Sequence, residues 1–356
     1  MNQLKSGILL ITIFLTGAFS SAQSQTTPSQ SETVDSVKTA AEAFKLINLP
    51  DPTFKPFQAP PMDSTQMADM GFEQVYKSEP SPFVMQDGKK LFAQTFSGSS
   101  NTTIILLHGI LSSSYTMNRC AGLIREATGA TVIALDLRGH GQSDGTPGDV
   151  DYIDQYADDV VDVIAAIKKN KPNGKIIIAG HSMGGGIALR YAMKKNAPLV
   201  DGYLLFSPLL GDNAPTIPKP TTTADTTSEP FMKIDIERII GLYLYNTIGV
   251  HKYDSLPVLF FNLPKEMPLH KYTYRSNKSM SPADYVAGLK AVKAPLLVLV
   301  GSKDEAFVAN EFKPAVENNS KGKVFVIEGV SHNGIRHSKE AMNKVKMWFQ
   351  SNYNAK

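Results

Sequence analysis

One serine in the sequence stands between a predicted strand and a predicted helix, with glycines on both sides. The stretch IIIAGHSMGGG covers residues 176–186 and includes Ser182. The β-branched run before Gly180 predicts a buried strand, and the apolar pattern after residue 186 predicts a helix. Gly180, Ser182 and Gly184 fit G-x-S-x-G, in which a strained turn lifts a serine hydroxyl into the open. Because a serine hydroxyl is a weak nucleophile at neutral pH, this chemistry needs a base and a buried carboxylate.

An acid and a histidine follow two later apolar runs in the order that this chemistry requires. Asp304 comes after PLLVLVG, and His332 comes after KVFVIEG. Ligands of open α/β sheets bind beyond the carboxyl ends of the strands, so Ser182, Asp304 and His332 are expected to converge there. We expect Ser182 to be the nucleophile, His332 the base and Asp304 the carboxylate that orients it. Glu305 and His337 are the alternatives for the acid and the base.

Two backbone N–H groups are the candidates for binding an oxyanion. One belongs to Met183, directly after the serine, and the other to Ile110, after the strand-ending His108-Gly109. The start of a helix provides free N–H groups and partial positive charge where an oxyanion would form. His108 and His181 are interpreted as structural residues, and residues 136–144 as a turn beside the site. The spacing of that turn does not fit a G-x-G-x-x-G phosphate loop.

Alternating strands and helices must position these residues. Strands that are apolar on both faces and alternate with helices predict a mostly parallel sheet covered on both sides, an α/β fold. Asp87-Gly88 between two β-like runs predicts a hairpin. The predicted strands cover residues 103–109, 131–136, 175–180, 203–208, 295–301 and 323–329, and the predicted helices cover 118–128 and 153–170.

The chain divides into four predicted parts. Residues 1–22 have the pattern of a cleaved signal peptide, with Lys5, an apolar stretch and a cleavage site after Ala22, which predicts export to the periplasm or the medium. An uncleaved membrane anchor is the alternative. Residues 23–82 are an N-terminal extension with a helical pattern at 37–49. Residues 83–208 and 295–356 form the predicted core, and residues 209–294 form an insertion, or cap, over one end of the sheet.

Composition excludes several classes of protein. The chain has 356 residues and a formal net charge of +3 with no basic cluster, so no nucleic-acid partner is expected. Its one cysteine, Cys120, excludes an internal disulfide and metal sites built on several thiolates.

The motifs together resemble the α/β-hydrolase family, in particular the branch of lysophospholipases and monoacylglycerol lipases with a helical cap. The matching motifs are DG (87–88), HGI (108–110), DLRGHGQSDG (136–145), GHSMGG (180–185), GSKDE (301–305) and GVSHNG (329–334). The resemblance implies hydrolysis of an acyl ester, no cofactor, and a cap that selects the acyl chain. Ile110-Leu111-Ser112-Ser113 departs from the usual sequence after His-Gly in monoacylglycerol lipases, which weakens any inference about glycerol recognition.

The sequence therefore predicts an exported serine hydrolase that acts on a small or lipid-like ester, including one held at a membrane surface. The same triad could serve acyl transfer, peptide hydrolysis or hydrolysis of a carbon–carbon bond. A binding protein built on a retired hydrolase scaffold is the alternative from another class. The aromatic residues at 231–274 could form either the core of the insertion or a substrate channel.

Overall fold

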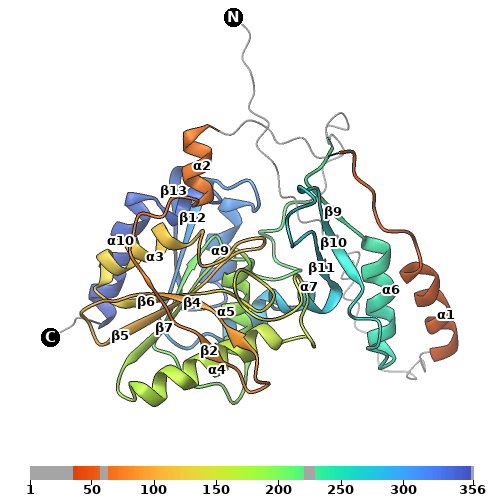
Figure 1. Cartoon of the computed structure of the whole chain (residues 1–356), viewed down its shortest axis with the longest axis horizontal. Coiled ribbons are helices and arrows are strands. Elements are labelled where there is room, and N and C mark those ends of the chain that lie inside the picture. The colour runs from red at the N-terminus through yellow and green to blue at the C-terminus, as the bar shows by residue number, and fades with distance from the viewer. Residues whose placement is uncertain (1–34, 57–62, 220–228, 354–356) are drawn as a thin grey trace, which may run out of the picture.

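A central sheet of eight strands carries the predicted site residues (Figure 1). The computed structural model describes residues 35–56, 63–219 and 229–353. The strands of this sheet are β1 (Glu79–Pro80), β4 (Ala93–Phe96), β5 (Thr102–Leu107), β6 (Thr131–Leu135), β7 (Lys175–His181), β8 (Gly202–Phe206), β12 (Leu296–Lys303) and β13 (Lys323–Ser331). Their order is β1-β4-β6-β5-β7-β8-β12-β13. The six strands from β6 to β13 pair in parallel, whereas β1 and β4 are antiparallel at one edge.

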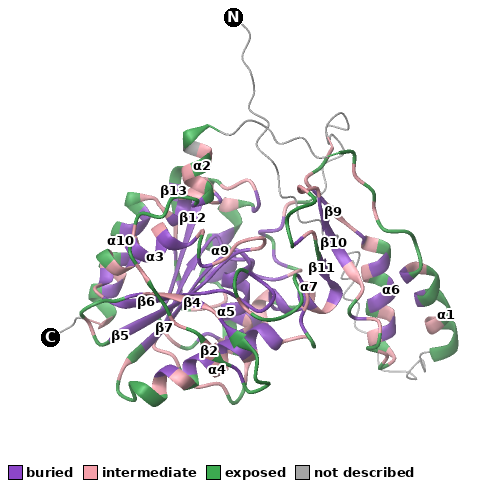
Figure 2. Cartoon of the chain, viewed as in Figure 1, coloured by how far each residue is buried: buried purple, intermediate pink, exposed green. Residues whose placement is uncertain are grey.

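Helices cover both faces of this sheet, as the apolar strands predict. They are α3 (Asn118–Thr128), α4 (Gln155–Asn170), α5 (Met183–Met193), α9 (Phe312–Glu317) and α10 (Lys339–Tyr353). Alternate residues of β5 point to opposite faces: Ile104 and Leu106 pack with α3 and α10, and Ile105 and Leu107 pack with α4 and α5. The inner strands β5, β6, β7, β8 and β12 are buried along most of their length, whereas β1 is exposed and β13 is only partly buried (Figure 2). The predicted α/β fold, with its mostly parallel sheet, is confirmed.

The insertion contains a small sheet of its own. Its elements are β9 (Met232–Ile234), α6 (Ile236–Thr247), β10 (Pro257–Phe261), β11 (Lys271–Thr273), α7 (Tyr274–Ser279) and α8 (Tyr285–Ala291). The three strands are antiparallel in the order β11-β10-β9, so the insertion is not purely helical. Strands of three to five residues are too short to give a clear periodic pattern. Most aromatic side chains of the segment are buried, among them Tyr245, Phe260, Phe261, Tyr272 and Tyr274.

The N-terminal extension contributes two helices and packs on both parts of the molecule. Helix α1 (Ser36–Ile47) lies against α6 of the insertion, and α2 (Ser64–Met70) lies against the core (Figure 1). Buried Arg238 of α6 donates to Asp51 and to the carbonyl of Leu49 at 2.7 Å each, which fixes the chain after α1. The core sheet begins at Glu79, four residues before the predicted boundary at Phe83, because β1 pairs with β4.

The predicted hairpin forms, and short 3-10 turns precede two helices of the core. Strands β2 (Phe83–Val84) and β3 (Lys90–Leu91) pair around Gly88, whose φ of +81° favours glycine. The 3-10 turns are η1 (Ala309–Glu311) and η2 (Gly334–Arg336).

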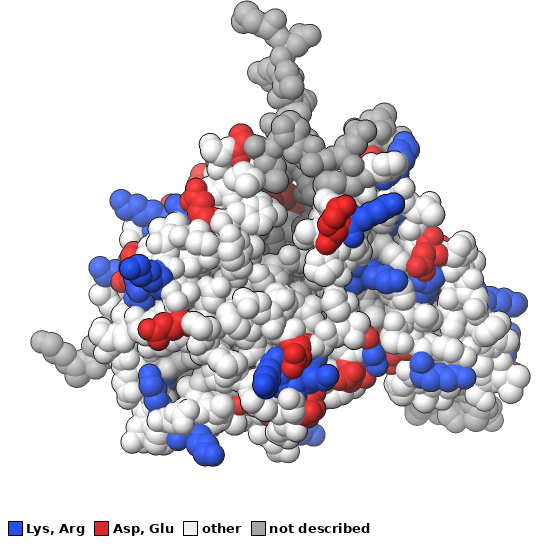
Figure 3. All heavy atoms as spheres, viewed as in Figure 1, with Lys and Arg blue, Asp and Glu red and all other residues white. Residues whose placement is uncertain are grey.

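Charged side chains of both signs are interspersed around the edge of the face in Figure 3, with a broad uncharged area between them. In the part of the chain that the structure describes, no helix is long and apolar enough to span a membrane. The predicted signal peptide (1–22) and residues 220–228 of the insertion lie outside the described residues.

The contact between α1 and α6 depends on a glycine. A Cβ at Gly241 would lie 2.8 Å from Ile47 Cγ2 and 2.9 Å from Leu46 Cβ. We expect Gly241→Leu to detach α1, although leucine favours the helix more than glycine does. Hydrogen–deuterium exchange of residues 36–47 should then accelerate while exchange in the core sheet stays unchanged. Tyr243→Leu, at an exposed position of the same helix, is the control. Unchanged protection of α1 in Gly241→Leu would contradict this packing.

Candidate active site

Ser182 lies on a strained turn between β7 and α5. Its backbone angles are φ +53° and ψ −118°, a conformation that costs a non-glycine residue about 1–3 kcal/mol. The surrounding packing leaves no room for side chains at the flanking glycines. A Cβ at Gly180 would lie 2.4 Å from the carbonyl carbon of Gly184, and a Cβ at Gly184 would lie 2.3 Å from the carbonyl oxygen of Leu107. The glycines of the motif therefore allow the strand and the helix to approach closely enough to form this turn.

His332 and Asp304 form a buried pair at the ends of β13 and β12. Nδ1 of His332 lies 3.0 Å from each carboxylate oxygen of Asp304. A carboxylate accepts a hydrogen bond here, so Nδ1 carries the proton and Nε2 is left as the acceptor. The backbone N–H groups of Ala306 and Phe307 also donate to Asp304, each at 2.9 Å. Burial raises the pKa of Asp304, but the charge and hydrogen bond of His332 and the hydrogen bond from the Phe307 N–H outweigh it and lower the pKa overall.

Glu305, the alternative for the acid, and His181 both contact the backbone of His332. Glu305 accepts a hydrogen bond from the backbone N–H of His332 at 2.9 Å, so it holds the loop rather than the imidazole ring. The ring of His181 lies 4.7 Å from that of His332, centroid to centroid, and its Nε2 donates to the carbonyl of His332 at 3.0 Å. His181 thereby links the turn of Ser182 to the loop of His332.

Ser182 and the His332–Asp304 pair lie at the same edge of the sheet. No hydrogen bond joins Ser182 Oγ to His332 among the residues that the structure describes. Catalytic hydrogen bonds of free enzymes are often long and close only when substrate binds. The arrangement can activate a serine hydroxyl, with the imidazole as base and the carboxylate as its support.

The loop that contains Ile110 lies against the serine. A Cβ on Gly109 would lie 3.3 Å from Ser182 Cβ. Nδ1 of His108 donates to the Gly109 carbonyl at 2.7 Å, and its Nε2 accepts from Leu137 N–H at 3.1 Å. Burial lowers the pKa of His108 to about 4, so the ring stays neutral with this tautomer. Since the C=O and N–H of a trans peptide point in opposite directions, this bond turns the Ile110 N–H away from His108.

The second donor, Met183, is the first residue of α5. The first N–H groups of a helix have no partner within it. Among the described residues, the backbone N–H groups of Ile110 and Met183 donate no backbone hydrogen bond in the turns, loops and helix caps. Both groups are therefore free to bind an oxyanion near Ser182.

The N-terminal extension reaches the loop of His332, a contact that the sequence did not indicate. Ser331 Oγ donates to Asp69 Oδ2 at 2.9 Å, and buried Arg336 donates to the Asp69 carbonyl at 2.6 Å. Tyr272 of the insertion contacts the loop of Ile110 and was also missed. Neither contact has a local signal, because the partners are more than 150 residues apart in sequence.

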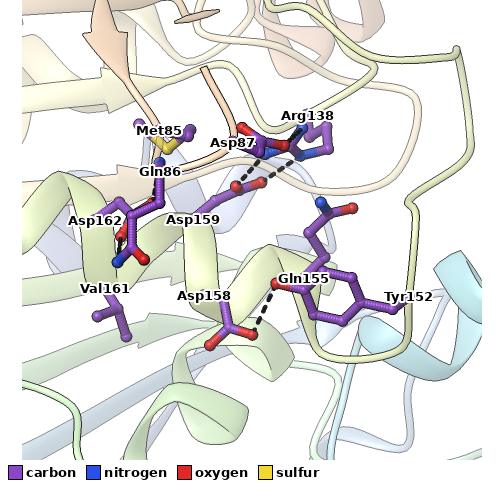
Figure 4. Close-up of a pocket in the computed structure, with 10 residues that line it drawn as sticks. All are labelled: Met85, Gln86, Asp87, Arg138, Tyr152, Gln155, Asp158, Asp159, Val161 and Asp162. Atoms are coloured by element: carbon purple, nitrogen blue, oxygen red, sulfur yellow. Dashed lines mark hydrogen bonds and ion pairs between the residues drawn. The ribbon is translucent and has the colours of Figure 1, made fainter. Parts of the chain in front are cut away.

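A pocket of about 320 Å³ lies beside α4, and no predicted site residue lines it (Figure 4). Its carboxylates are already paired: Arg138 contacts Asp87 and Asp159, Gln86 contacts Asp162, and Lys194 contacts Asp158. These contacts stabilise the junction of the hairpin with α4. Within residues 35–56, 63–219 and 229–353, no group of three or more His, Cys, Asp or Glu side chains is placed to hold a metal ion.

Comparisons with known proteins agree with this fold. Residues 98–255 match the family described as serine aminopeptidase, S33. The chain is 28% identical over 236 residues to the AB hydrolase superfamily protein YisY of Bacillus subtilis, covering 63% of this chain and 82% of that protein. It is 33% identical over 118 residues to a monoacylglycerol lipase of Mycolicibacterium smegmatis, covering 29% of this chain and 42% of that protein. The match thus spans less than half of the lipase.

The solved structure of Est1E from Butyrivibrio proteoclasticus, with ferulic acid bound, has the same fold. It superposes with a TM-score of 0.54 at 19% identity, covering 77% of this chain and all of that chain. The sheet and these matches together show that the chain has the α/β-hydrolase fold, which its motifs indicated.

His337, the other candidate for the base, does not contact either carboxylate of the site. Both of its ring nitrogens are buried without a hydrogen-bond partner in the described structure. Burial, together with Arg336 and Arg119, lowers its pKa to about 3. An unfolded histidine has a pKa of about 6.5, so below that pH the unfolded chain takes up a proton that the folded chain does not.

Protonation of His337 should therefore destabilise the fold as the pH falls from about 6.5 towards 3. Each such group contributes up to about 1.4 kcal/mol per pH unit. His337→Phe removes the titrating group, so between pH 7 and 5 its free energy of unfolding should fall by roughly 2 kcal/mol less than that of the wild type. Urea unfolding at both pH values measures this. Parallel curves for the two proteins would contradict the prediction.

Proposed function

We propose that the protein is an exported serine hydrolase that cleaves carboxylic esters, with lipid-like acyl esters as the favoured class. One observation carries the proposal: strained Ser182 stands at the start of a helix, at the sheet edge that also holds the His332–Asp304 pair. Structural packing alone gives no reason for a serine in a conformation that favours glycine.

In the proposed mechanism, Oγ of Ser182 attacks the ester carbonyl while Nε2 of His332 takes its proton. Asp304 stabilises the imidazolium that forms. The N–H groups of Ile110 and Met183 bind the negative oxygen of the tetrahedral intermediate. When the bond to the leaving oxygen breaks, His332 gives its proton to that oxygen, and Ser182 is left acylated. A water molecule then attacks the acyl group, His332 accepts its proton, and the acid leaves as Ser182 regains its hydrogen.

The substrate class rests on the relatives. The chain matches part of a protein named monoacylglycerol lipase in sequence, and it shares the fold of Est1E, which was solved with ferulic acid bound. The family description, serine aminopeptidase, favours peptide hydrolysis as the second candidate. Export is proposed from the pattern of residues 1–22 alone. The intact mass of the exported protein tests it, and the mass of a chain that starts at Gln23 is expected.

Hydrolysis of p-nitrophenyl esters with acyl chains of two to sixteen carbons tests the proposal. We expect the mature protein to be active and Ser182→Ala to lose about 10⁴-fold or more in kcat, because the nucleophile is gone. A maximum at long chains would support lipid-like substrates, and a maximum at two to four carbons would restrict the enzyme to small esters. Turnover of aminoacyl p-nitroanilides without ester turnover would favour the peptidase. Equal activity of a folded Ser182→Ala protein would overturn the proposal.

Asp304→Asn tests the assignment of the acid. An amide can donate to Nδ1 of His332, which would move the proton to Nε2 and leave no acceptor for Ser182. We expect kcat to fall about 10⁴-fold with little change in stability. In Glu305→Gln the amide oxygen can still accept from the backbone N–H of His332, so the loss should stay within about tenfold. A larger loss in Glu305→Gln than in Asp304→Asn would reverse the two roles.

A further inference from the structure

We propose that Tyr272, on strand β11 of the insertion, is a positioning residue for the oxyanion loop, defined as residues 108–111. The inference rests on the proposed function, because it concerns how the Ile110 N–H is held for the reaction. It gives the insertion a role in holding the oxyanion loop.

The oxyanion loop has a conformation that needs support from outside. Leu111 has a φ of +57°, in the left-handed region that L-residues rarely adopt. Its backbone N–H donates to the hydroxyl oxygen of Tyr272 at 2.8 Å. Tyr272 is fully buried, so no water competes for this bond. The insertion thereby supplies the acceptor that satisfies the strained residue.

The Tyr272 hydroxyl also contacts Nε2 of His140, and the tautomer of His140 decides which of the two groups donates. Nδ1 of His140 lies 2.9 Å from the carbonyl of Arg138, which can only accept, so Nδ1 carries the proton. Burial, with nearby His108 second, lowers the pKa of His140 to about 3, and its Nε2 therefore remains an acceptor at neutral pH. The Tyr272 hydroxyl, 2.8 Å from Nε2, donates to it. The chain of bonds runs from Leu111 N–H to Tyr272 and on to His140, with every donor and acceptor satisfied.

Strand β11 is attached firmly to the core beside Tyr272. The backbone N–H of Thr273 donates to the carbonyl of Gly148 at 3.0 Å, and its hydroxyl donates to Asp149 at 2.6 Å. Arg275 donates to both carboxylate oxygens of Asp149, at 2.9 and 2.6 Å. A Cβ at Gly148 would lie 2.0 Å from the carbonyl oxygen of Lys271, so the two backbones are in direct contact. These contacts fix the position of Tyr272 relative to the core.

The two peptides that flank Ile110 are therefore held from two sides. His108 fixes the carbonyl of Gly109, and Tyr272 fixes the N–H of Leu111. The Ile110 N–H lies between these two anchors, and small displacements of a catalytic group reduce rates steeply. Because the Tyr272 hydroxyl already donates to His140, it has no proton to offer an oxyanion. Tyr272 acts through Ile110 and is not itself a catalytic residue.

Tyr272→Phe tests the proposal, with Tyr156→Phe as the matched control. Tyr156 is also fully buried and also joins core to insertion, through a 3.0 Å contact with Ser276, but it makes no hydrogen bond to the oxyanion loop. The assay uses the purified mature chain and the p-nitrophenyl ester for which the wild type has the highest kcat/KM. We expect Tyr272→Phe to lower kcat about 10- to 100-fold while KM stays within about threefold. Tyr156→Phe should change both by less than about threefold.

An alkyl boronic acid provides the second readout, because its adduct with Ser182 carries an oxygen in the oxyanion position. Its inhibition constant should rise in Tyr272→Phe by about the same factor as kcat/KM falls, and stay constant in Tyr156→Phe. Equal effects of the two variants on kcat and on boronate inhibition would overturn the inference while the esterase assignment stands. A wild-type protein that hydrolyses no ester or anilide overturns the proposed function, and this inference with it.

Discussion

The close contact between the start of α5 and the end of β5 determines the geometry of the site. Gly184 has no Cβ, and its backbone lies against the carbonyl of Leu107, the last residue of β5. The same contact brings strained Ser182 beside the loop that starts at His108. One glycine therefore sets the distance between the proposed nucleophile and a proposed oxyanion donor. Strands β12 and β13 then need only end at the same edge to deliver Asp304 and His332.

The histidines around this contact have two different roles: some hold the backbone, and one is placed for proton transfer. His108, His140 and His181 are buried, and burial is the main cause that lowers the pKa of each. Each stays neutral and uses a fixed tautomer to hold backbone in place. His332 instead faces the carboxylate of Asp304, so a positive charge on its ring would be stabilised. The partner of each histidine decides whether it supports the loop or can take part in proton transfer.

Much of this arrangement could be predicted from the sequence, because strand ends and glycine spacing are local signals. The strands that end near Ser182, Asp304 and His332 form as their apolar runs indicate, and α3 has its predicted bounds. The sequence left Glu305 and His337 as alternatives, since both lie within a few residues of the favoured ones. It could not identify Tyr272, which bonds to a residue 161 positions away, nor Asp69, which reaches Ser331 from the extension. The strands of the insertion are too short to give a periodic pattern, so its small sheet could not be predicted from the sequence.

Covalent labelling tests the central claim, that Ser182 is an activated nucleophile, most directly. The mature protein would be treated with an alkyl fluorophosphonate, and its intact mass and peptide map would be recorded. The account predicts one adduct per chain, located on Ser182, and no adduct in folded Ser182→Ala. An unlabelled wild-type protein, or an adduct that persists on another residue in Ser182→Ala, would contradict it.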